Sequence, residues 1–478
     1  MTHTTRHPAT DAALTALEAD RGAVLAMLGD LVRIPGVSAA GPDSPALADS
    51  ARAVAQVLAG AGLENVAVLP HPGAPPYVVG DWCRQPGRPT LLIYGHHDVQ
   101  PPGNPARWQS PPWRPEERNG RLYGRGVADD KAGIMTHVAA LRAWRAAAGA
   151  PPVNVKFIIE GEEEVGSPNL GAFLARHRER LAADCLVLTD TCNLDVGVPA
   201  LTVSLRGLVV ADVTVAALAG PVHSGIWGGP LPDPVQALAK ILARLSDERG
   251  RVAIPAIADT APSGPDGRHR ALPFDLARFR AQAGLLDGVP LLTDGAEATY
   301  WATWNAPCVT VSAIDCVPLA ESSNQIVPAA RARVGVRLAP GQDAAACQRA
   351  LVAFLAADPP FGCRVSVTPD CAGGGWQGTA RGPWFDAAGA ALAEGYGRPS
   401  VHIGCGGSIP FVEPFAHAMG GIPALLLGVE DPECRAHGEN ESLHLDDFAK
   451  ACRAAVCLLG RAAALGTDTR PSFPTETP

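Results

Sequence analysis

The sequence has few lysines, few aromatic residues and no long apolar run. Only four of its 39 basic residues are lysines, and with 48 acidic residues the formal net charge at pH 7 is −9. Nucleic acids and anionic lipids are bound by clustered Lys and Arg, so neither is expected as the main partner. No window holds about 18 consecutive apolar residues, the length that a membrane-spanning helix requires. We therefore expect a protein that acts neither on nucleic acid nor within a membrane.

The cysteines and the start of the chain exclude two further classes. The twelve cysteines are spread over 478 residues and include no C-x-x-C pair. A disulfide framework is therefore not expected, and the thiols should be reduced and buried. The first residues, MTHTTRHPATDAALTALEAD, lack a cationic region followed by an apolar stretch and a small-residue cleavage site. They do not resemble a secretory signal, so we expect a cytoplasmic protein.

The N-terminal third alternates between helical and strand-like patterns. At 478 residues with 47% apolar content, the chain should form two or three domains with sizeable cores. Helices are predicted over residues 11–32, 46–61 and 132–148, and strands over residues 77–80, 90–94, 153–159 and 185–188. This alternation predicts an α/β fold with a mostly parallel sheet and helices on both faces.

The pattern changes at Ser204. One long alternating strand, SLRGLVVADVTVAA, is followed by a helix, two strands, a helix and a strand. The order β-α-β-β-α-β is that of a ferredoxin-like unit. The Pro/Gly-rich stretch 254–290 interrupts it as a loop or a helical excursion, and helix–strand alternation resumes after Trp376. We therefore expect one α/β domain, residues 1–203 and 375–478, split by an inserted domain over residues 204–374.

Polar residues that can carry chemistry gather where predicted strands end, which is the expected place for a site in an open α/β sheet. In LLIYGHHDVQP, His96 and Asp98 are two residues apart and share a face of the strand. A metal-bound histidine commonly gives its other ring N–H to a carboxylate, and Asp98 suits that role. The alternative is a polar strand end with ordinary hydrogen bonds.

The segment LYGRGVADDKAG places Asp129 and Asp130 beside glycines and before a helix. Glycines allow a ligand to approach the backbone closely. The spacing misses both glycine fingerprints of phosphate loops, and two acids would repel an anion. A surface turn is the other interpretation.

Acidic residues also close two strongly apolar strands. VKFIIEGEEEVGSPNL carries four glutamates, of which Glu163 and Glu164 are adjacent, and DCLVLTD ends in Asp190. Such a charge run is commonly a solvated face, but unpaired acids at the end of a buried strand are costly. A bound divalent cation would remove that cost. Late in the chain, ECRAHGENESLHL places His437 in a Gly-containing loop before the last helix.

Together these segments offer two histidines and several carboxylates. Mixed nitrogen and oxygen ligands suit zinc, with cobalt or manganese as alternatives. The ligands are too many for one tetrahedral ion. A pair of ions about 3.5–4 Å apart that share a bridging carboxylate fits the set better.

Five motifs occur in order along the chain: G-H-x-D-V, G-R-G-x-x-D-D-K, E-G-x-E-E-x-G-S, G-G-S-I-P and H-x-x-N-E. They resemble the dinuclear zinc metallopeptidases that include carnosine dipeptidase, aminoacylase, succinyl-diaminopimelate desuccinylase and glutamate carboxypeptidase. The resemblance runs from about Leu14 to Leu465. It implies that the inserted domain is a lid that forms the interface of a homodimer.

The resemblance also implies roles for individual residues. Two divalent cations per subunit, Zn²⁺ or else Mn²⁺ or Co²⁺, would be held by His96, Asp129, Glu164, Asp190 and His437. Asp129 would bridge both ions, and its bond to Asp130 is often cis in this family. Asp190 would share one ion with His96, and Glu164 the other with His437. Asp98 would orient His96, and Glu163 would be the general base.

The remaining implied site residues lie later in the chain. His223 in PVHSGIWGG would reach the partner subunit's site and polarise the scissile carbonyl, the alternative being a structural turn histidine. Arg337 in VGVRLAP and Ser408 in GCGGSIP would hold the substrate carboxylate, with Asn324 as a further candidate. Cys405 stands where carnosinase-like relatives often have Glu.

The implied activity is hydrolysis of the amide bond of dipeptides. Asp at the position of Asp190 goes with dipeptidases and aminopeptidases in this family, and Glu with deacylases and carboxypeptidases. The alternatives are an N-acyl-amino-acid deacylase or a carboxypeptidase on the same scaffold. A non-catalytic binding protein is a third reading, but such relatives usually lose a ligand or the base, and none is missing here.

Overall fold

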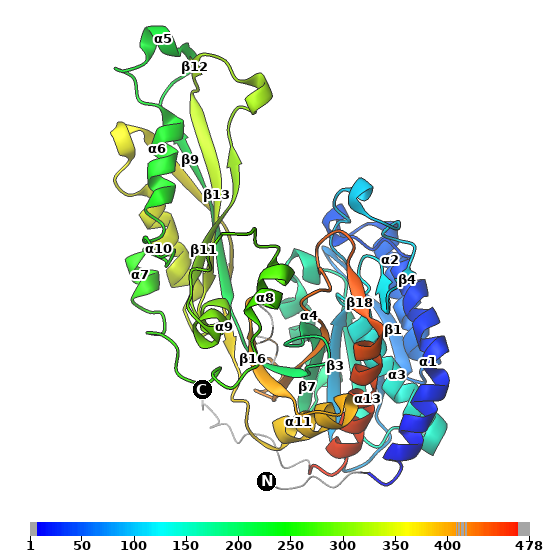
Figure 1. Ribbon diagram of the computed structural model, residues 1–478. Coiled ribbons are helices and arrows are strands. Elements are labelled where there is room, and N and C mark those ends of the chain that lie inside the picture. Colours follow the sequence, from blue (N-terminus) through cyan, green and yellow to red (C-terminus); the bar gives the residue numbers. More distant parts are fainter. Residues whose placement is uncertain (1–6, 408, 410–411, 413–414, 416–417, 467–478) are drawn as a thin grey trace, which may run out of the picture. The chain divides into compact units, whose positions relative to one another are not determined.

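The structure, a computed structural model, describes residues 7–407, 409, 412, 415 and 418–466. They divide into two compact units (Figure 1). The first unit comprises the described residues of 1–203, 378–403 and 411–478, and the second those of 204–377 and 404–410. In the described part of the chain, no helix is both long and apolar enough to cross a membrane.

A twisted sheet forms the centre of the first unit. Its strands follow the order β1-β2-β6-β3-β7-β17-β8. Their bounds are β1 (Glu64–His71), β2 (Ala74–Trp82), β3 (Thr90–His96), β6 (Asn154–Glu160), β7 (Cys185–Cys192), β8 (Ala200–Leu205) and β17 (Ala424–Glu430). The four central strands β6, β3, β7 and β17 are parallel, whereas β1, β2 and β8 join antiparallel. The prediction of a mostly parallel central sheet is confirmed, with antiparallel strands added at both sides.

Helices cover both faces of this sheet, because successive residues of each strand point to opposite sides. Val78 packs in the larger core, whereas its neighbour Tyr77 stacks on Phe173 of α4 (Leu170–Leu181) at a ring-centroid distance of 3.9 Å. The helices of the larger core are α1 (Thr10–Val32), α2 (Pro45–Gly60), α3 (Lys131–Ala148), α11 (Pro383–Tyr396) and α13 (Leu445–Ala462). Figure 1 shows α1 and α13, from opposite ends of the chain, beside α3.

A small antiparallel sheet joins two distant segments of the first unit. Its order is β18-β5-β4, with β4 (Glu116–Arg118), β5 (Arg121–Tyr123) and β18 (Ser442–His444). This pairing brings the residues between β5 and α3 to the same end of the main sheet as the residues just before β18.

The second unit is a four-stranded antiparallel sheet with helices on one face. The strand order is β11-β13-β9-β14, and the chain order β9, α6, β11, β13, α10, β14 gives the β-α-β-β-α-β succession. The bounds are β9 (Gly207–Ala216), α6 (Pro234–Ala243), β11 (Cys308–Asp315), β13 (Ala329–Leu338), α10 (Ala344–Ala356) and β14 (Arg364–Gly373). Alternate residues of the strands pack against α6 and α10 in a core of their own.

Two expectations are refined by this unit. The long strand predicted from Ser204 corresponds to β9 over Gly207–Ala216, but Ser204 and Leu205 end β8 instead, because β8 and β9 pair with strands of different sheets. The Pro/Gly-rich stretch is a helical excursion. The shorter elements here are α5 (Ser224–Trp227), α7 (Pro255–Ala258), α8 (Leu276–Ala283), α9 (Ala296–Trp304), β10 (Val222–His223), β12 (Gln325–Ile326) and β15 (Trp376–Gln377). Strand β16 (Val401–Cys405) pairs with β8 of the main sheet.

Candidate dinuclear metal centre

The four central parallel strands of the first unit all end in ionisable side chains. His96 ends β3, Glu160 ends β6 and Glu430 ends β17, while Asp190 lies near the end of β7. The carboxyl ends of parallel strands meet at one edge of a sheet, which is where sites form in open α/β folds. These side chains are buried or nearly so. The sheet therefore concentrates acidic groups around one histidine.

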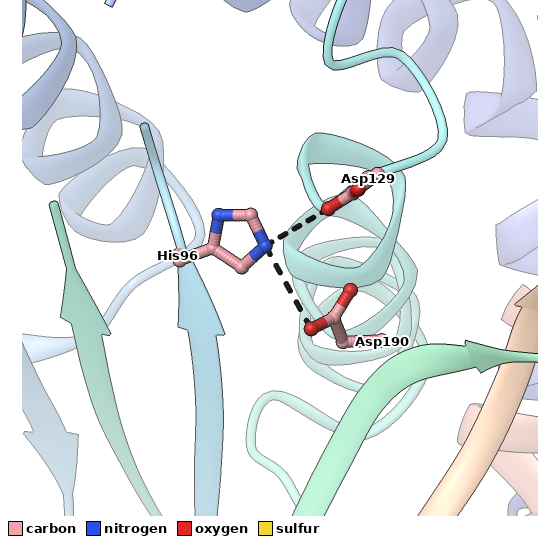
Figure 2. Close-up of side chains that lie close together, drawn as sticks. All are labelled: His96, Asp129 and Asp190. Atoms are coloured by element: carbon pink, nitrogen blue, oxygen red, sulfur yellow. Dashed lines mark ion pairs between the residues drawn. The ribbon is translucent and has the colours of Figure 1, made fainter. Parts of the chain in front are cut away.

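His96 forms the first of two groups around Asp129. Its Nε2 lies 3.0 Å from Oδ1 of Asp129 and 3.7 Å from Oδ2 of Asp190. Figure 2 shows this ring nitrogen pointing between the two carboxylates, with Asp129 in the loop that leads into α3. Nε2 is fully buried and makes no hydrogen bond within the described residues. The other ring nitrogen, Nδ1, lies 3.1 Å from the carbonyl oxygen of Asp98 and 3.4 Å from its carboxylate, which fixes the direction of the ring.

His437 forms the second group. Its Nε2 lies 3.0 Å from Oδ2 of Asp129 and 3.1 Å from Oε2 of Glu164. Within each group the ligand atoms lie within 4.8 Å of one another. Asp129 belongs to both groups and presents one oxygen to each histidine. This is the arrangement of a carboxylate that bridges two ions.

The electrostatics of the centre are those of an acidic site that favours cations. Burial, followed by the charges of other carboxylates, raises the pKa of Asp190 to about 6 and that of Glu163 well above its usual range. Contacts with Asp129 and Glu164 raise the pKa of His437 to about 11. The donor set of imidazole nitrogens and carboxylate oxygens suits zinc, manganese or cobalt. The residues present therefore fit the expected pair of divalent cations.

The run of four glutamates separates into two pairs with different surroundings. Glu160 accepts a hydrogen bond from the Tyr94 hydroxyl at 2.5 Å, and burial raises its pKa to about 8. Glu162 accepts one from the Tyr77 hydroxyl at 2.7 Å. These two side chains are held by tyrosines inside the unit. Glu164 contacts His437 of the centre, and the charges of His96 and Asp190 act on Glu163.

Asp98 connects the first histidine with this glutamate pair. Its two carboxylate oxygens accept the backbone N–H groups of Glu163 and Glu164 at 3.2 and 3.1 Å. The same carboxylate contacts His96. Asp98 therefore aligns a ligand of one group with the backbone of a ligand of the other.

The structure adds three residues to which the sequence analysis gave no role. Gln100 donates from its side-chain amide to Oε2 of Glu164 at 2.9 Å and from its backbone to Oε1 at 3.1 Å. Glu430 is buried, and burial together with the charge of Asp129 raises its pKa. Glu441 accepts the Asp129 backbone N–H at 3.3 Å. Gln100 lies inside GHHDVQP and Glu441 ends H-x-x-N-E, so motif membership was the available signal for both.

Two smaller features also concern this centre. The peptide bond between Asp129 and Asp130 is cis, as the resemblance implied. His97 is buried, and its Nε2 lies 3.0 Å from the carbonyl oxygen of Pro76, away from the ligand groups.

The other expected site residues lie in the second unit or outside the described residues. His223 is exposed on β10, and Ser224 donates its backbone N–H to the Asn324 carbonyl at 2.8 Å, so His223 and Asn324 lie close together. Arg337 is half-buried on β13, opposite Cys308 of β11. Ser408 lies outside the described residues.

Comparison with known proteins gives a consistent result. A model described as peptidase family M20/M25/M40 matches residues 92–461. The cysteinylglycine-S-conjugate dipeptidase of Corynebacterium striatum is 35% identical over 357 residues, covering 74% of this chain and 77% of the relative. The Cys-Gly metallodipeptidase of Schizosaccharomyces pombe is 27% identical over 391 residues, covering 79% and 81%. The crystal structure of human carnosine dipeptidase 1 shares the fold with a TM-score of 0.84 at 23% identity, covering 96% of this chain and 100% of that one.

Proposed function

Because the chain belongs to peptidase family M20/M25/M40, we propose that it is a metal-dependent dipeptidase that hydrolyses the amide bond of free dipeptides. The observation that carries the proposal is the pair of histidine–carboxylate groups that share Asp129. Relatives named as Cys-Gly dipeptidases make Cys-Gly and its S-conjugates the first substrates to test.

In this proposal the two groups hold two divalent cations, with zinc as the first choice. His96, Asp129 and Asp190 would hold one ion, and Asp129, Glu164 and His437 the other. Cations bound there would act as Lewis acids toward the amide carbonyl and lower the pKa of the nucleophilic water. His437 is 59% exposed, so its group is open to an incoming substrate within the first unit.

Glu163 is proposed to be the general base. It follows the two tyrosine-held glutamates and precedes the ligand Glu164, and Asp98 fixes its backbone at 3.2 Å. Glu163 takes a proton from water as the water oxygen adds to the amide carbon. The carbon–nitrogen bond then breaks, and Glu163 gives the proton to the leaving amine. Burial raises the pKa of Glu163, and a carboxylate with a raised pKa is a better proton acceptor for the first step.

The second unit is proposed to supply substrate contacts and the interface of a homodimer. Its edge strand β11 has one unpaired side among the described residues, and apolar side chains on and after it are exposed, including Ile314 at 62% and Leu319 at 93%. Exposed edges of this kind are suited to pairing with a second copy. His223 would act in the site of the partner subunit, and Arg337, Ser408 and Asn324 would hold the substrate carboxylate.

The test is hydrolysis of a panel by the full-length protein. The panel contains free dipeptides, including Cys-Gly, S-conjugated Cys-Gly and β-Ala-His, together with matched N-acyl amino acids. Rates are measured before chelation, after chelation, and after Zn²⁺, Mn²⁺ or Co²⁺ is restored. We expect cleavage of free dipeptides that is lost on chelation and returns with metal. Cleavage confined to the acylated compounds, or unaffected by chelation, would overturn the proposal.

A further inference from the structure

A buried ion pair lies next to the centre without contributing a ligand atom. Arg125 and Glu441 are 1% and 0% exposed, and Nη1 of the arginine lies 2.7 Å from Oε2 of the glutamate. Removing two charges from water is costly, and a buried pair is commonly no more stabilising than apolar residues of similar size. The remaining contacts of the two side chains therefore need a separate explanation.

Glu441 holds the backbone that leads to Asp129. Its Oε2 also accepts the backbone N–H of Gly126 at 2.8 Å, and its Oε1 accepts those of Ala128 at 3.0 Å and Asp129 at 3.3 Å. One carboxylate thus fixes three N–H groups within four consecutive residues. The last of these residues carries the carboxylate that both ligand groups share.

Arg125 holds the backbone of His437 in the same way. Its Nη2 donates to the carbonyl oxygens of Pro101, His437 and Gly438 at 3.0 to 3.1 Å. His437 has a positive φ of 64°, a conformation that side chains other than glycine rarely adopt, so its backbone needs such support. The Arg125 guanidinium therefore connects the loop of His437 with Glu441, whose carboxylate holds the backbone of Asp129.

We propose that Arg125 and Glu441 are positioning residues that set the spacing between Asp129 and His437 for cation binding. The inference rests on the proposed metal-dependent function. The ion pair fixes the positions of the two side chains. Their hydrogen bonds to the backbone in turn fix the positions of Asp129 and His437. Groups that orient metal ligands in this way typically contribute about 10- to 100-fold in metal affinity or activity.

A second buried ion pair supplies a matched control. Nη2 of Arg121 lies 2.7 Å from Oδ2 of Asp431, and its Nε donates to the Ser442 hydroxyl at 2.8 Å. This pair joins the same two regions of the chain as Arg125 and Glu441 do. Its hydrogen bonds do not involve the backbone of His437 or Asp129.

The experiment compares full-length wild type with E441Q, R125K and D431N. Each protein is stripped with a chelator and titrated with Zn²⁺ against a competing chromophoric chelator, and thermal unfolding of the stripped protein is recorded. We expect E441Q to weaken both Zn²⁺ sites by about 10- to 100-fold, because Asp129 serves both. R125K keeps a charge beside Glu441 but loses most of the carbonyl contacts, so it should weaken mainly the His437 site, by about 10-fold.

D431N should lower the unfolding temperature of the stripped protein while keeping both Zn²⁺ affinities within about threefold of wild type, below the range typical of positioning groups. Wild-type affinities in E441Q would overturn the inference and leave the proposed function intact. Equal losses in D431N and E441Q would also overturn it, because the pair would then act only through general stability. If E441Q does not fold, the Zn²⁺ affinities of R125K test the inference instead. Unchanged Zn²⁺ affinity, or an equal loss of affinity at both sites, would contradict the inference. A wild-type protein that binds none of Zn²⁺, Mn²⁺ and Co²⁺ would overturn the proposed function itself.

Discussion

Replacing Glu163 by glutamine removes a proton acceptor while leaving the rest of the centre in place. The contacts that hold this segment are the backbone N–H groups of Glu163 and Glu164, donated to Asp98 at 3.2 and 3.1 Å. Neither contact involves the side chain that is changed. The contact of Glu164 with His437, at 3.1 Å, should therefore persist. We expect E163Q to fold as the wild type does and to bind the same number of metal ions.

The expected loss of rate follows from the role of a general base. Such a group typically contributes about 10²- to 10⁴-fold to the rate. This range corresponds to about 3–5 kcal/mol of activation free energy. Because the base acts in the chemical step, kcat should fall by this factor while KM changes little. The assay is initial rates on a free dipeptide at saturating metal, with metal content measured by elemental analysis on the same preparation.

Two results would refute this reasoning about Glu163. An E163Q enzyme with wild-type kcat shows that the proton is accepted elsewhere. An E163Q protein that has lost one ion, set beside an E164Q protein that keeps both, shows that the two adjacent glutamates have been assigned in the wrong order. E164Q is the matched control because its side chain, and not that of Glu163, contacts His437.

The remaining predictions concern the shared ligand, the partner subunit and the tyrosine-held glutamates. D129N should abolish binding of both ions, because each carboxylate oxygen of Asp129 lies 3.0 Å from a different histidine. A stripped D129N protein that still binds one ion in calorimetry would contradict this prediction. Equal mixing of the inactive E163Q and H223A subunits should restore about a quarter of the wild-type rate if dimers form at random and His223 serves the partner subunit; no recovery argues against a shared site. Y77F should lower the free energy of unfolding in urea by about 1–3 kcal/mol without changing KM, because it leaves the buried Glu162 one hydrogen bond short. A Y77F protein as stable as the wild type would show that Glu162 does not need this bond.

The helices were easier to predict than the edges of the main sheet. The expected helix 11–32 corresponds to α1 (Thr10–Val32), and the expected helix 132–148 to α3 (Lys131–Ala148). Strand β1 (Glu64–His71) was missed. Its residues are half-buried or exposed, and it is held by antiparallel pairing with β2, so it lacks a strong apolar pattern of its own. Strand propensity depends on the neighbouring strand, which sequence patterning alone does not specify.

The residues of the site also differ in how well the sequence predicts their positions. His96 and Asp190 could be placed at one edge from strand patterns, because both follow apolar runs of a parallel sheet. The position of His437 could not be obtained in this way, because it lies well along the loop after β17 rather than at the end of that strand. The family resemblance supplied its expected role, and the pairing of β18 with β5 places it in the structure. The contacts of Gln100 and Glu441 were missed because they join segments far apart in the chain.

The two ligand groups differ in how much of the chain they require. His96 and Asp190 lie in the first stretch of the first unit, as does Asp129, so one group needs only the strands and the helix start of that stretch. The other group needs His437, which is 312 residues beyond Arg125, the residue that holds its carbonyl. These two segments are held together by the pairing of β18 with β5 and by the ion pair between Arg125 and Glu441. Cations that bind both groups through Asp129 would therefore stabilise the docking of the last segment onto the first, which joins metal binding to completion of the fold.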